Sequence, residues 1–523
     1  MQVEHEGTMA RGAWDDFVSL CSARDCAPED VLGEVCIWLI CRPRSASDDG
    51  CEESVRSVVA ETAVPQGMNP HDTGNDCDES YRIERPDHPQ AAGRHPGQGD
   101  DIRVMAHTRV GLFRGLCALD TGDDDVDERP DADALSNSLH DSFSDSLNGS
   151  FTAPQMPWRG CLLDVDRYQC TVAEIKQVID MLALHRMSVL HLHLTDHQSW
   201  RMPVPGFARL DALPGLFSPE ELHDLRDYAR SRYVEIVPEI DLPGHCAALL
   251  AVYPELAGLP SFPHVLMSYI GPDTPLAARF LRGCVDALVD LATGPYIHIG
   301  GDEVFGMPQD RNDRALDILV GRARERGAKV IGWQEASRAV ADLDAYQYWM
   351  SDADIPSEAD LVSSWPKQYE ELARKAAAMY TQCHDDPQRF ARKSAAVVDS
   401  RQTWWYLDRK YAESSLDEDQ NTRMNTLEFP GYASKDSLDV CDWDPLPTAR
   451  RDGAVEACVW TETVHSVADL ETLLLPRLGV LAAAAWRGRA LSRREATVLC
   501  RRYRHAWAAM HCDGYYRSAT LFS

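Results

Sequence analysis

The sequence predicts an α/β fold, namely a (β/α)8 TIM barrel preceded by a small α+β domain. The chain has 523 residues, enough for two or three domains. From about residue 157, eight short apolar runs alternate with amphipathic stretches, which is typical of a parallel sheet. These runs occupy about 300 residues, and a (β/α)8 barrel takes about 250 or more. The predicted strands are Cys161–Val165, Val189–Leu194, Tyr233–Ile240, Tyr296–Ile299, Lys329–Trp333, Ala345–Met350, Ala395–Val398 and Ala454–Trp460.

Residues 1–120 have a different pattern and are predicted to form the small α+β domain. Ser80–Ile83 and Ile102–Ala106 are predicted strands, and Arg109–Leu119 is a predicted helix. Residues 121–156 are predicted to be a linker or insertion. Ten acids and one base lie between Asp120 and Asp145, and serine is frequent there, a composition that disfavours a packed core.

Residues 157–523 are predicted to form the barrel and a C-terminal helix. Thr171–Glu174 has the pattern of a capping box, in which two side chains cap the start of a helix. Ser218–Glu221 repeats this pattern, with proline at the first helical position. From about Ser492, apolar residues recur at helical spacing. A doubly wound sheet is the alternative fold, but no glycine-rich phosphate loop follows the first strand.

Composition excludes several classes of function. The net charge of −31 argues against nucleic acid or an anionic membrane as a partner. No apolar run reaches the roughly 18–20 residues that a membrane helix needs. The polar, acidic start lacks the pattern of a secretory signal, and the sequence leaves the cellular compartment open. The 16 cysteines are scattered without zinc-like spacing. Neither a metal nor another cofactor is expected, since no third ligand stands at zinc-like spacing to the histidines His191 and His193.

Polar and aromatic side chains stand at the ends of nearly all predicted strands. Catalytic groups of a barrel lie at the carboxyl ends of its strands, so these side chains should converge in one deep pocket. Tryptophan faces suit the C–H face of a pyranose ring, while carboxylates and arginine bind its hydroxyls. These residues are Arg159, Asp164, Asp196, Glu239, Asp241, His245, Asp302, Glu303, Trp333, Glu335, Trp349, Tyr406, Asp408, Trp460 and Glu462. His191 and His193 share one face of a strand and are expected to be core or supporting groups rather than ligands.

The adjacent acids Asp302 and Glu303 follow an apolar strand and the pair Gly300–Gly301. Glycoside cleavage usually needs two carboxyl groups on either side of the scissile bond. Neighbours on a regular strand point to opposite faces, although the glycines permit a local distortion of the backbone. A pair this close suggests that the nucleophile is not the second carboxylate.

These residues resemble glycoside hydrolase family 20, the β-N-acetylhexosaminidases, from about Pro157 to Trp486. The resemblance includes the segment before the barrel, at Tyr81–Ile83 and Gly111–Gly115. It rests mainly on seven blocks in the barrel: Trp158–Asp164, His191–Asp196, Asp241–His245, His298–Val304, Gly332–Glu335, Tyr406–Asp408 and Ala457–Glu462.

The resemblance implies substrate-assisted retention, in which the 2-acetamido oxygen of the substrate attacks C1 and forms an oxazolinium ion. It implies that Glu303 is the acid and base, and that Asp302 orients the acetamido N–H and stabilises positive charge. Tyr406 would bind the acetamido oxygen. The implied substrate-binding residues are Arg159, Asp196, His245, Trp333, Trp349, Asp408, Trp460 and Glu462. We expect a raised pKa for Glu303 and an ionised Asp302.

The substrate implied by the resemblance is a glycan or glycoconjugate that ends in β-linked GlcNAc or GalNAc, or a chitin oligomer. A homodimer is possible by analogy with relatives. The alternative is a catalytically inactive GlcNAc-binding protein on the same barrel. The presence of Glu303 favours the enzyme, because an inactive relative would be expected to have lost its acid.

Overall fold

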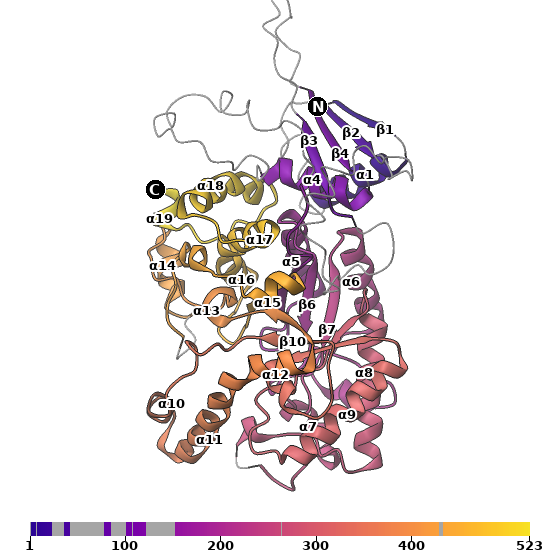
Figure 1. Ribbon diagram of the computed structural model, residues 1–523, viewed down its shortest axis with the longest axis vertical. Coiled ribbons are helices and arrows are strands. Elements are labelled where there is room, and N and C mark those ends of the chain that lie inside the picture. Colours follow the sequence, from indigo (N-terminus) through magenta and orange to yellow (C-terminus); the bar gives the residue numbers. More distant parts are fainter. Residues whose placement is uncertain are drawn as a thin grey trace, which may run out of the picture.

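The computed structural model places a small four-stranded sheet above an eight-stranded barrel (Figure 1). It describes residues 2–6, 8–22, 36–41, 78–84, 101–106, 108–121, 152–262, 264–427 and 432–523. Within this part of the chain, no helix combines the length and apolar character that crossing a bilayer requires. Most buried apolar side chains of both parts belong to one continuous core.

The barrel is closed and all of its strands are parallel, which confirms the predicted fold class. Its strands follow the order β10-β11-β12-β5-β6-β7-β8-β9 around the barrel. Each of the eight predicted runs overlaps one of them, with ends that differ by up to a few residues. They are β5 (Trp158–Asp164), β6 (Val189–His193), β7 (Glu235–Glu239), β8 (Tyr296–His298), β9 (Lys329–Trp333), β10 (Ala345–Tyr348), β11 (Ala396–Asp399) and β12 (Ala454–Val459).

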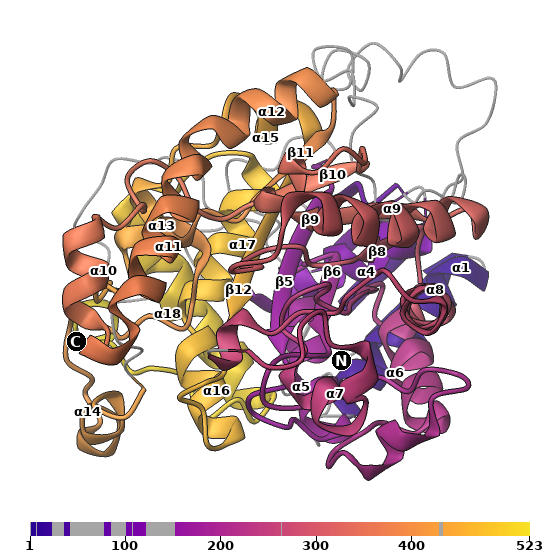
Figure 2. The ribbon, with the colours of Figure 1, turned by 90° about the horizontal axis from the view of Figure 1, so that it is seen from below.

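Helices surround the barrel (Figure 2) and begin where the sequence supplies caps. Thr171 and Ser218 both form the predicted capping boxes, at the starts of α5 (Val172–Leu184) and α6 (Pro219–Ser231). The helix predicted from Ser492 is α18 (Arg493–Ala509). The other helices after barrel strands include α7 (Ala247–Val252), α8 (Pro275–Leu291), α9 (Gln309–Glu325), α13 (Gln402–Trp405), α14 (Glu418–Met424), α15 (Pro447–Asp452), α16 (Val467–Leu474), α17 (Arg477–Arg487) and α19 (Ala519–Phe522).

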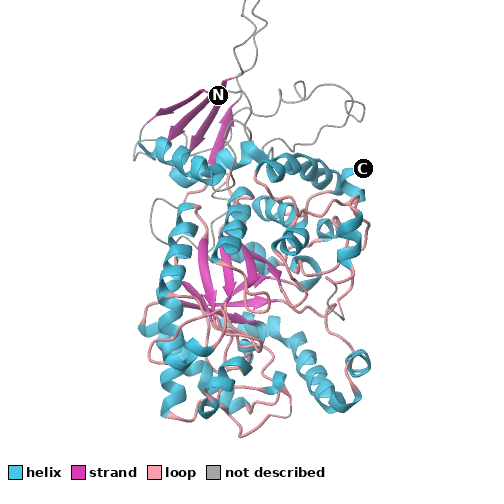
Figure 3. Cartoon of the chain, turned by 180° about the vertical axis from the view of Figure 1, so that it is seen from behind, coloured by secondary structure: helices cyan, strands magenta, loops and turns pink. Residues whose placement is uncertain are grey.

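Two connections of the barrel depart from a simple strand–helix repeat. After β9 the chain forms only a short 3-10 helix, η6 (Gln334–Arg338), before β10 begins. Between β10 and β11 it forms α10 (Glu358–Ser364), α11 (Glu370–Thr381) and α12 (Asp386–Lys393). Helices α10 and α11 project from the side of the barrel, as the two opposite views in Figures 1 and 3 both show. We call these two helices the arm.

The N-terminal unit is a four-stranded sheet with two helices on the side that faces the barrel (Figure 1). The strand order is β1-β2-β4-β3, comprising β1 (Gln2–Glu6), β2 (Cys36–Cys41), β4 (Asp101–Ala106) and β3 (Tyr81–Glu84). Helices α1 (Thr8–Ser22) and α4 (Arg109–Thr121) lie between this sheet and the barrel. The predicted strands and helix before residue 120 are confirmed, and β1, α1 and β2 are additional. The acidic segment lies mostly outside the described residues, and the domain boundaries stay a prediction.

Candidate active site

Asp302 and Glu303 lie just beyond the carboxyl end of β8, where the backbone leaves the strand geometry. Gly300 and Gly301 have φ values of +71° and +97°, and Glu303 itself has a φ of +46°. A Cβ on Gly300 would stand 1.8 Å from the carboxylate of Asp241, so glycine is required there for space as well as for φ. The expected distortion of the backbone is therefore present. A positive φ at a non-glycine residue such as Glu303 is uncommon and clusters at functional sites.

Glu303 is held between two neighbours. Its Oε1 accepts a hydrogen bond from the hydroxyl of Tyr380, and its Oε2 lies 3.9 Å from Nε2 of His245. The side chain of Glu303 is about a quarter exposed (24%), which leaves it accessible to a ligand. Tyr380 lies in α11 of the arm, and no sequence motif pointed to it.

Asp302 shares the same histidine but has a different environment. Its Oδ2 lies 3.7 Å from Nε2 of His245, while its Oδ1 is buried without a hydrogen-bond partner among the described residues. Burial, and next the nearby Asp241, raise the pKa of Asp302 well above its usual range. Burial and the neighbouring carboxylates thus oppose the ionised form of Asp302 that was expected, and the imidazole of His245 acts in the other direction.

Asp196 and His245 form the predicted polar network with this acid pair. Nδ1 of His245 lies 3.0 Å from Oδ2 of Asp196. Burial opposes the charge on His245, but Asp196 and Asp241 outweigh it and raise the pKa of the imidazole well above its usual value. Burial likewise opposes the charge on Asp196, but Arg167 and His245 lower the pKa of this carboxyl below its usual range. The network therefore presents a protonated imidazole to Asp302 and Glu303.

Aromatic side chains form one cluster close to the acids, and Tyr380 of this cluster donates to Glu303. The rings of Trp349 and Tyr406 are nearly parallel, at a centroid distance of 6.3 Å, and the rings of Trp333 and Trp460 are 5.9 Å apart. The indole of Trp349 donates to Glu335 over 3.1 Å, and that of Trp333 donates over 2.9 Å to a carboxylate of the barrel interior. The predicted tryptophans and tyrosine thus form one fixed wall.

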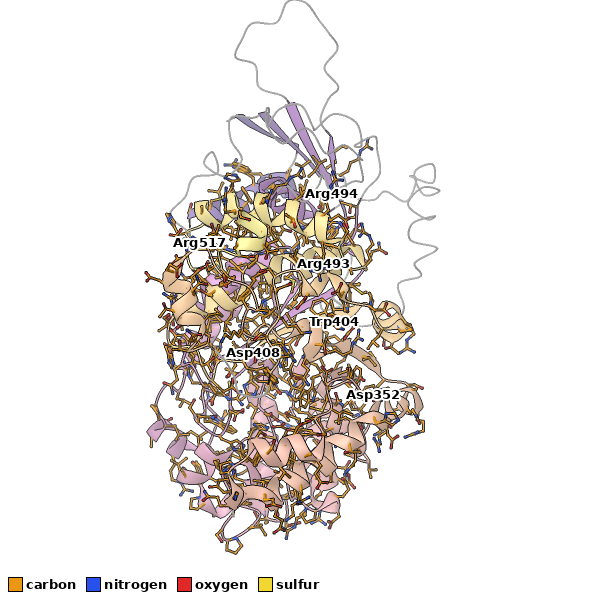
Figure 4. The ribbon with its side chains drawn as sticks, turned by 90° about the vertical axis from the view of Figure 1, so that its left-hand side faces the viewer. Asp352, Trp404, Asp408, Arg493, Arg494 and Arg517 are labelled. Carbon is orange, nitrogen blue, oxygen red and sulfur yellow. The ribbon has the colours of Figure 1, made fainter. Side chains whose placement is uncertain are left out.

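Asp408 and Glu462 form the opposite, polar part of the site. Asp408 lies near the middle of the molecule, well below α18 with its labelled arginines (Figure 4). Among the described residues, neither carboxylate oxygen of Asp408 has a hydrogen-bond partner, although the side chain is buried. Burial and the nearby Glu462 raise the pKa of Asp408 to about 8. Hydroxyls of a bound sugar could donate hydrogen bonds to these two free carboxylate oxygens.

The state of Asp408 leads to a prediction about stability. The asparagine variant Asp408→Asn is expected to be more stable than the natural protein at pH 7, by about 1–3 kcal/mol, because the aspartate must take up a proton when it is buried, whereas the amide is neutral in both states. The pKa of aspartate is about 3.9 in an unfolded chain. Because its folded value is higher, the native state loses stability as the pH rises from about 4 to 8.

Thermal melting of both proteins across pH 4–8 tests this prediction. The difference in Tm should be small near pH 4 and should grow as the pH rises. The exposed Asp211 provides the matched control, since Asp211→Asn should follow the natural protein at each pH. A stability difference for Asp408→Asn that is constant with pH would contradict the assignment.

The prediction for Arg159 is wrong, because this residue lies at the other end of β5. Its fully buried guanidinium pairs with Glu79 of the N-terminal unit and donates to the carbonyl oxygens of Met156 and Arg186. It entered the prediction through the family resemblance, as the arginine of the block Trp158–Asp164. A side chain at the amino end of a barrel strand, however, points away from the catalytic end.

Arg167 occupies the place that was assigned to Arg159. It follows the carboxyl end of β5 by three residues, and its Nη2 lies 2.5 Å from Asp196 and 3.8 Å from Glu462. Its guanidinium also lies 5.2 Å from the ring centre of Trp460, over one wall of the pocket. Its position in the sequence could have identified Arg167, because it is the arginine that follows the carboxyl end of the predicted first strand.

A buried polar network fills the barrel beneath the site. His191 lies 2.9 Å from Glu239 and 2.7 Å from Glu456, and His298 lies 2.8 Å from Glu239. His191 and His193 are fully buried, as expected of core and supporting residues. His191, Glu239 and His298 are close enough to share a cation, as are Asp241, His245 and Asp302. In both groups the imidazoles face carboxylates, which are also their partners in the described part of the chain.

Comparisons with known proteins agree with this geometry. The family model described as glycosyl hydrolase family 20, catalytic domain, matches residues 156–489. A β-N-acetylhexosaminidase of Cellulomonas fimi is 32% identical over 355 residues, which cover 64% of this chain and 64% of that protein. A β-hexosaminidase of Akkermansia muciniphila is 26% identical over 377 residues, which cover 64% and 69% of the two chains. The chain thus spans just under two thirds of the first relative.

Solved structures show the same fold over nearly the whole chain. The family 20 β-N-acetylhexosaminidase of Streptomyces coelicolor A3(2) superposes with a TM-score of 0.68 at 23% identity, covering 100% of this chain and 94% of that one. A β-hexosaminidase of Streptomyces plicatus superposes with a TM-score of 0.66 at 23% identity, with coverage of 99% and 93%. At such identities the likeness establishes the fold alone. The family model covers well over half of the sequence, and the chain therefore belongs to glycosyl hydrolase family 20.

Proposed function

We propose that this protein is an exo-acting β-N-acetylhexosaminidase that removes terminal GlcNAc or GalNAc by substrate-assisted retention. The observation that carries the proposal is the position of Asp302 and Glu303. Both carboxylates lie within 4.0 Å of the same nitrogen, Nε2 of His245, so both stand on one side of the pocket. They cannot attack and protonate a glycosidic bond from opposite faces, as the usual two-carboxylate mechanism requires.

A nucleophile supplied by the substrate resolves this geometry. In the first step the 2-acetamido oxygen forms a bond to C1 while the bond from C1 to the leaving oxygen breaks. Glu303 transfers its proton to that oxygen. In the second step water attacks C1 and reopens the oxazolinium ring, and Glu303 takes the proton of the water. Two displacements at C1 retain the β-configuration.

The other side chains of the site have matching roles in this proposal. Asp302 accepts the acetamido N–H, and the positive charge that develops next to it favours its ionised form and offsets the burial that raises its pKa. Tyr406 binds the acetamido oxygen, with Trp333, Trp349 and Trp460 as walls. The sugar hydroxyls are held by Asp408, Glu462 and Arg167. The ion pairs of Arg167 with Glu462 and Asp196 support this set of contacts.

The test is hydrolysis of the p-nitrophenyl β-glycosides of GlcNAc and GalNAc, followed by proton NMR of the first sugar released. We expect turnover, with the β-anomer appearing before mutarotation. A thiazoline analogue of the oxazolinium ion should bind at least about 10²-fold tighter than GlcNAc, as transition-state analogues do. Release of the α-anomer would refute retention. A folded protein that binds GlcNAc without turnover would instead be the inactive sugar-binding alternative.

A further inference from the structure

The arm reaches back to the active site through one residue, Tyr380. Helices α10 and α11 project from the barrel (Figures 1 and 3), and Tyr380 is the next-to-last residue of α11. Its hydroxyl donates a hydrogen bond to Oε1 of Glu303. The ring of Tyr380 packs edge-on against Trp349 and against Phe305, with centroid distances of 6.2 Å in both cases. Tyr380 therefore lies between the pocket wall and the loop that carries the acid.

The base of the arm is fixed to the ends of two barrel strands. Asp386, the first residue of α12, is fully buried and accepts hydrogen bonds from Arg338 over 2.7 Å and from Gln334 over 3.2 Å. The side-chain oxygen of Gln334 in turn accepts from the backbone N–H of Trp349 over 3.0 Å. These contacts join α12 to the residues that follow β9 and β10. Arg338 also donates to the carbonyl oxygen of Met379, the residue before Tyr380, over 3.3 Å, so residues after a barrel strand hold the end of α11 in place.

We propose that Tyr380 is a positioning residue for the acid Glu303, and this inference rests on the proposed function. The phenol donates to Oε1, so the proton to be transferred is carried by Oε2. As that proton leaves for the glycosidic oxygen, Glu303 becomes a carboxylate, and a hydrogen bond to a charged acceptor is about twice as strong as one to a neutral acceptor. The contact therefore strengthens during the reaction and contributes to kcat.

The test compares two leaving groups in the Tyr380→Phe variant, which keeps the ring and loses the hydroxyl. Methyl β-GlcNAc has a poor leaving group that needs protonation, whereas 2,4-dinitrophenyl β-GlcNAc has a good one that does not. We expect kcat to fall by about 10- to 100-fold on the methyl glycoside. On the dinitrophenyl glycoside it should change by no more than about threefold, with similar KM values, because the acid contributes little there.

The pH profile gives a second readout that a packing defect would not change. The titratable groups around Glu303 in the described part of the chain are Tyr380 from α11, His245 after β7, Glu335 in η6, Tyr432 from the segment after α14, and Asp302 beside it, with Asp241 behind Asp302 and His245. Loss of a donor destabilises the carboxylate form of Glu303. The basic limb of kcat/KM, which requires a protonated acid, should therefore move to higher pH in Tyr380→Phe.

A matched control and a double variant complete the experiment. Tyr346 is buried in β10 against Phe390, away from the acid, so Tyr346→Phe should behave as the natural protein on both substrates. In a Glu303→Gln background, Tyr380→Phe should add no further loss, because both changes remove the same function. Equal losses on both substrates with an unmoved basic limb would overturn the inference. A natural protein without turnover of either substrate would overturn the proposed function as well.

Discussion

Replacing Glu303 with glutamine is expected to lower kcat/KM for p-nitrophenyl β-GlcNAc by about 10²- to 10⁴-fold, the usual contribution of a general acid and base. Glutamine keeps the size of the side chain and can still accept the hydrogen bond of Tyr380, but it has no proton to give to the leaving oxygen. The second step is also affected, since the same carboxylate activates the water. KM should change much less than kcat.

Steady-state kinetics of the purified Glu303→Gln protein measures this loss. The exposed Glu325, in a surface ion pair on α9, provides the matched control, and Glu325→Gln should retain the full rate. The thiazoline analogue should still bind to Glu303→Gln, because its contacts are with the walls of the pocket. If the variant kept more than about a tenth of the rate, Glu303 would not be the acid.

The fold was predictable because each barrel strand is buried on both faces. Such strands appear in the sequence as continuous apolar runs, as at Tyr296–His298, which the structure shows fully buried. Residues of the candidate site were predictable for a related reason, since a polar or aromatic group at the end of an apolar run lies near a strand end. Asp302 follows the glycine pair after β8, Trp333 is the last residue of β9, and Trp460 directly follows β12.

Two residues of the candidate site could not be predicted in the same way. The difference between Arg159 and Arg167 is a matter of which end of β5 each one occupies, and both ends carry an arginine. Tyr380 contacts Glu303 across 77 positions of the chain, from a helix that the barrel pattern does not require. Contacts of this kind depend on how a long connection folds back, and periodicity carries no information about that.

The largest effect on stability is expected from the buried ion pairs that involve Arg159, which lies outside the candidate site. Oxygens of Glu79 pair with Nε of Arg114 over 2.8 Å and with Nη2 of Arg159 over 2.5 Å, and all three side chains are buried. Arg114 belongs to α4 of the N-terminal unit, and Arg159 belongs to the barrel. One carboxylate thus pairs with two guanidinium groups where the two parts of the chain meet.

Glu79→Ala is expected to destabilise the protein by about 3–5 kcal/mol, because removing one partner leaves uncompensated buried charge. Thermal or urea unfolding measures the loss, and Glu325→Ala, which breaks exposed ion pairs with Arg282 and Arg322, should change the stability little. The cluster lies at the amino end of β5, opposite the catalytic end. At a temperature where the variant is still folded, its kcat should therefore equal that of the natural protein. A lowered kcat with unchanged stability would mean that Arg159 serves the active site after all.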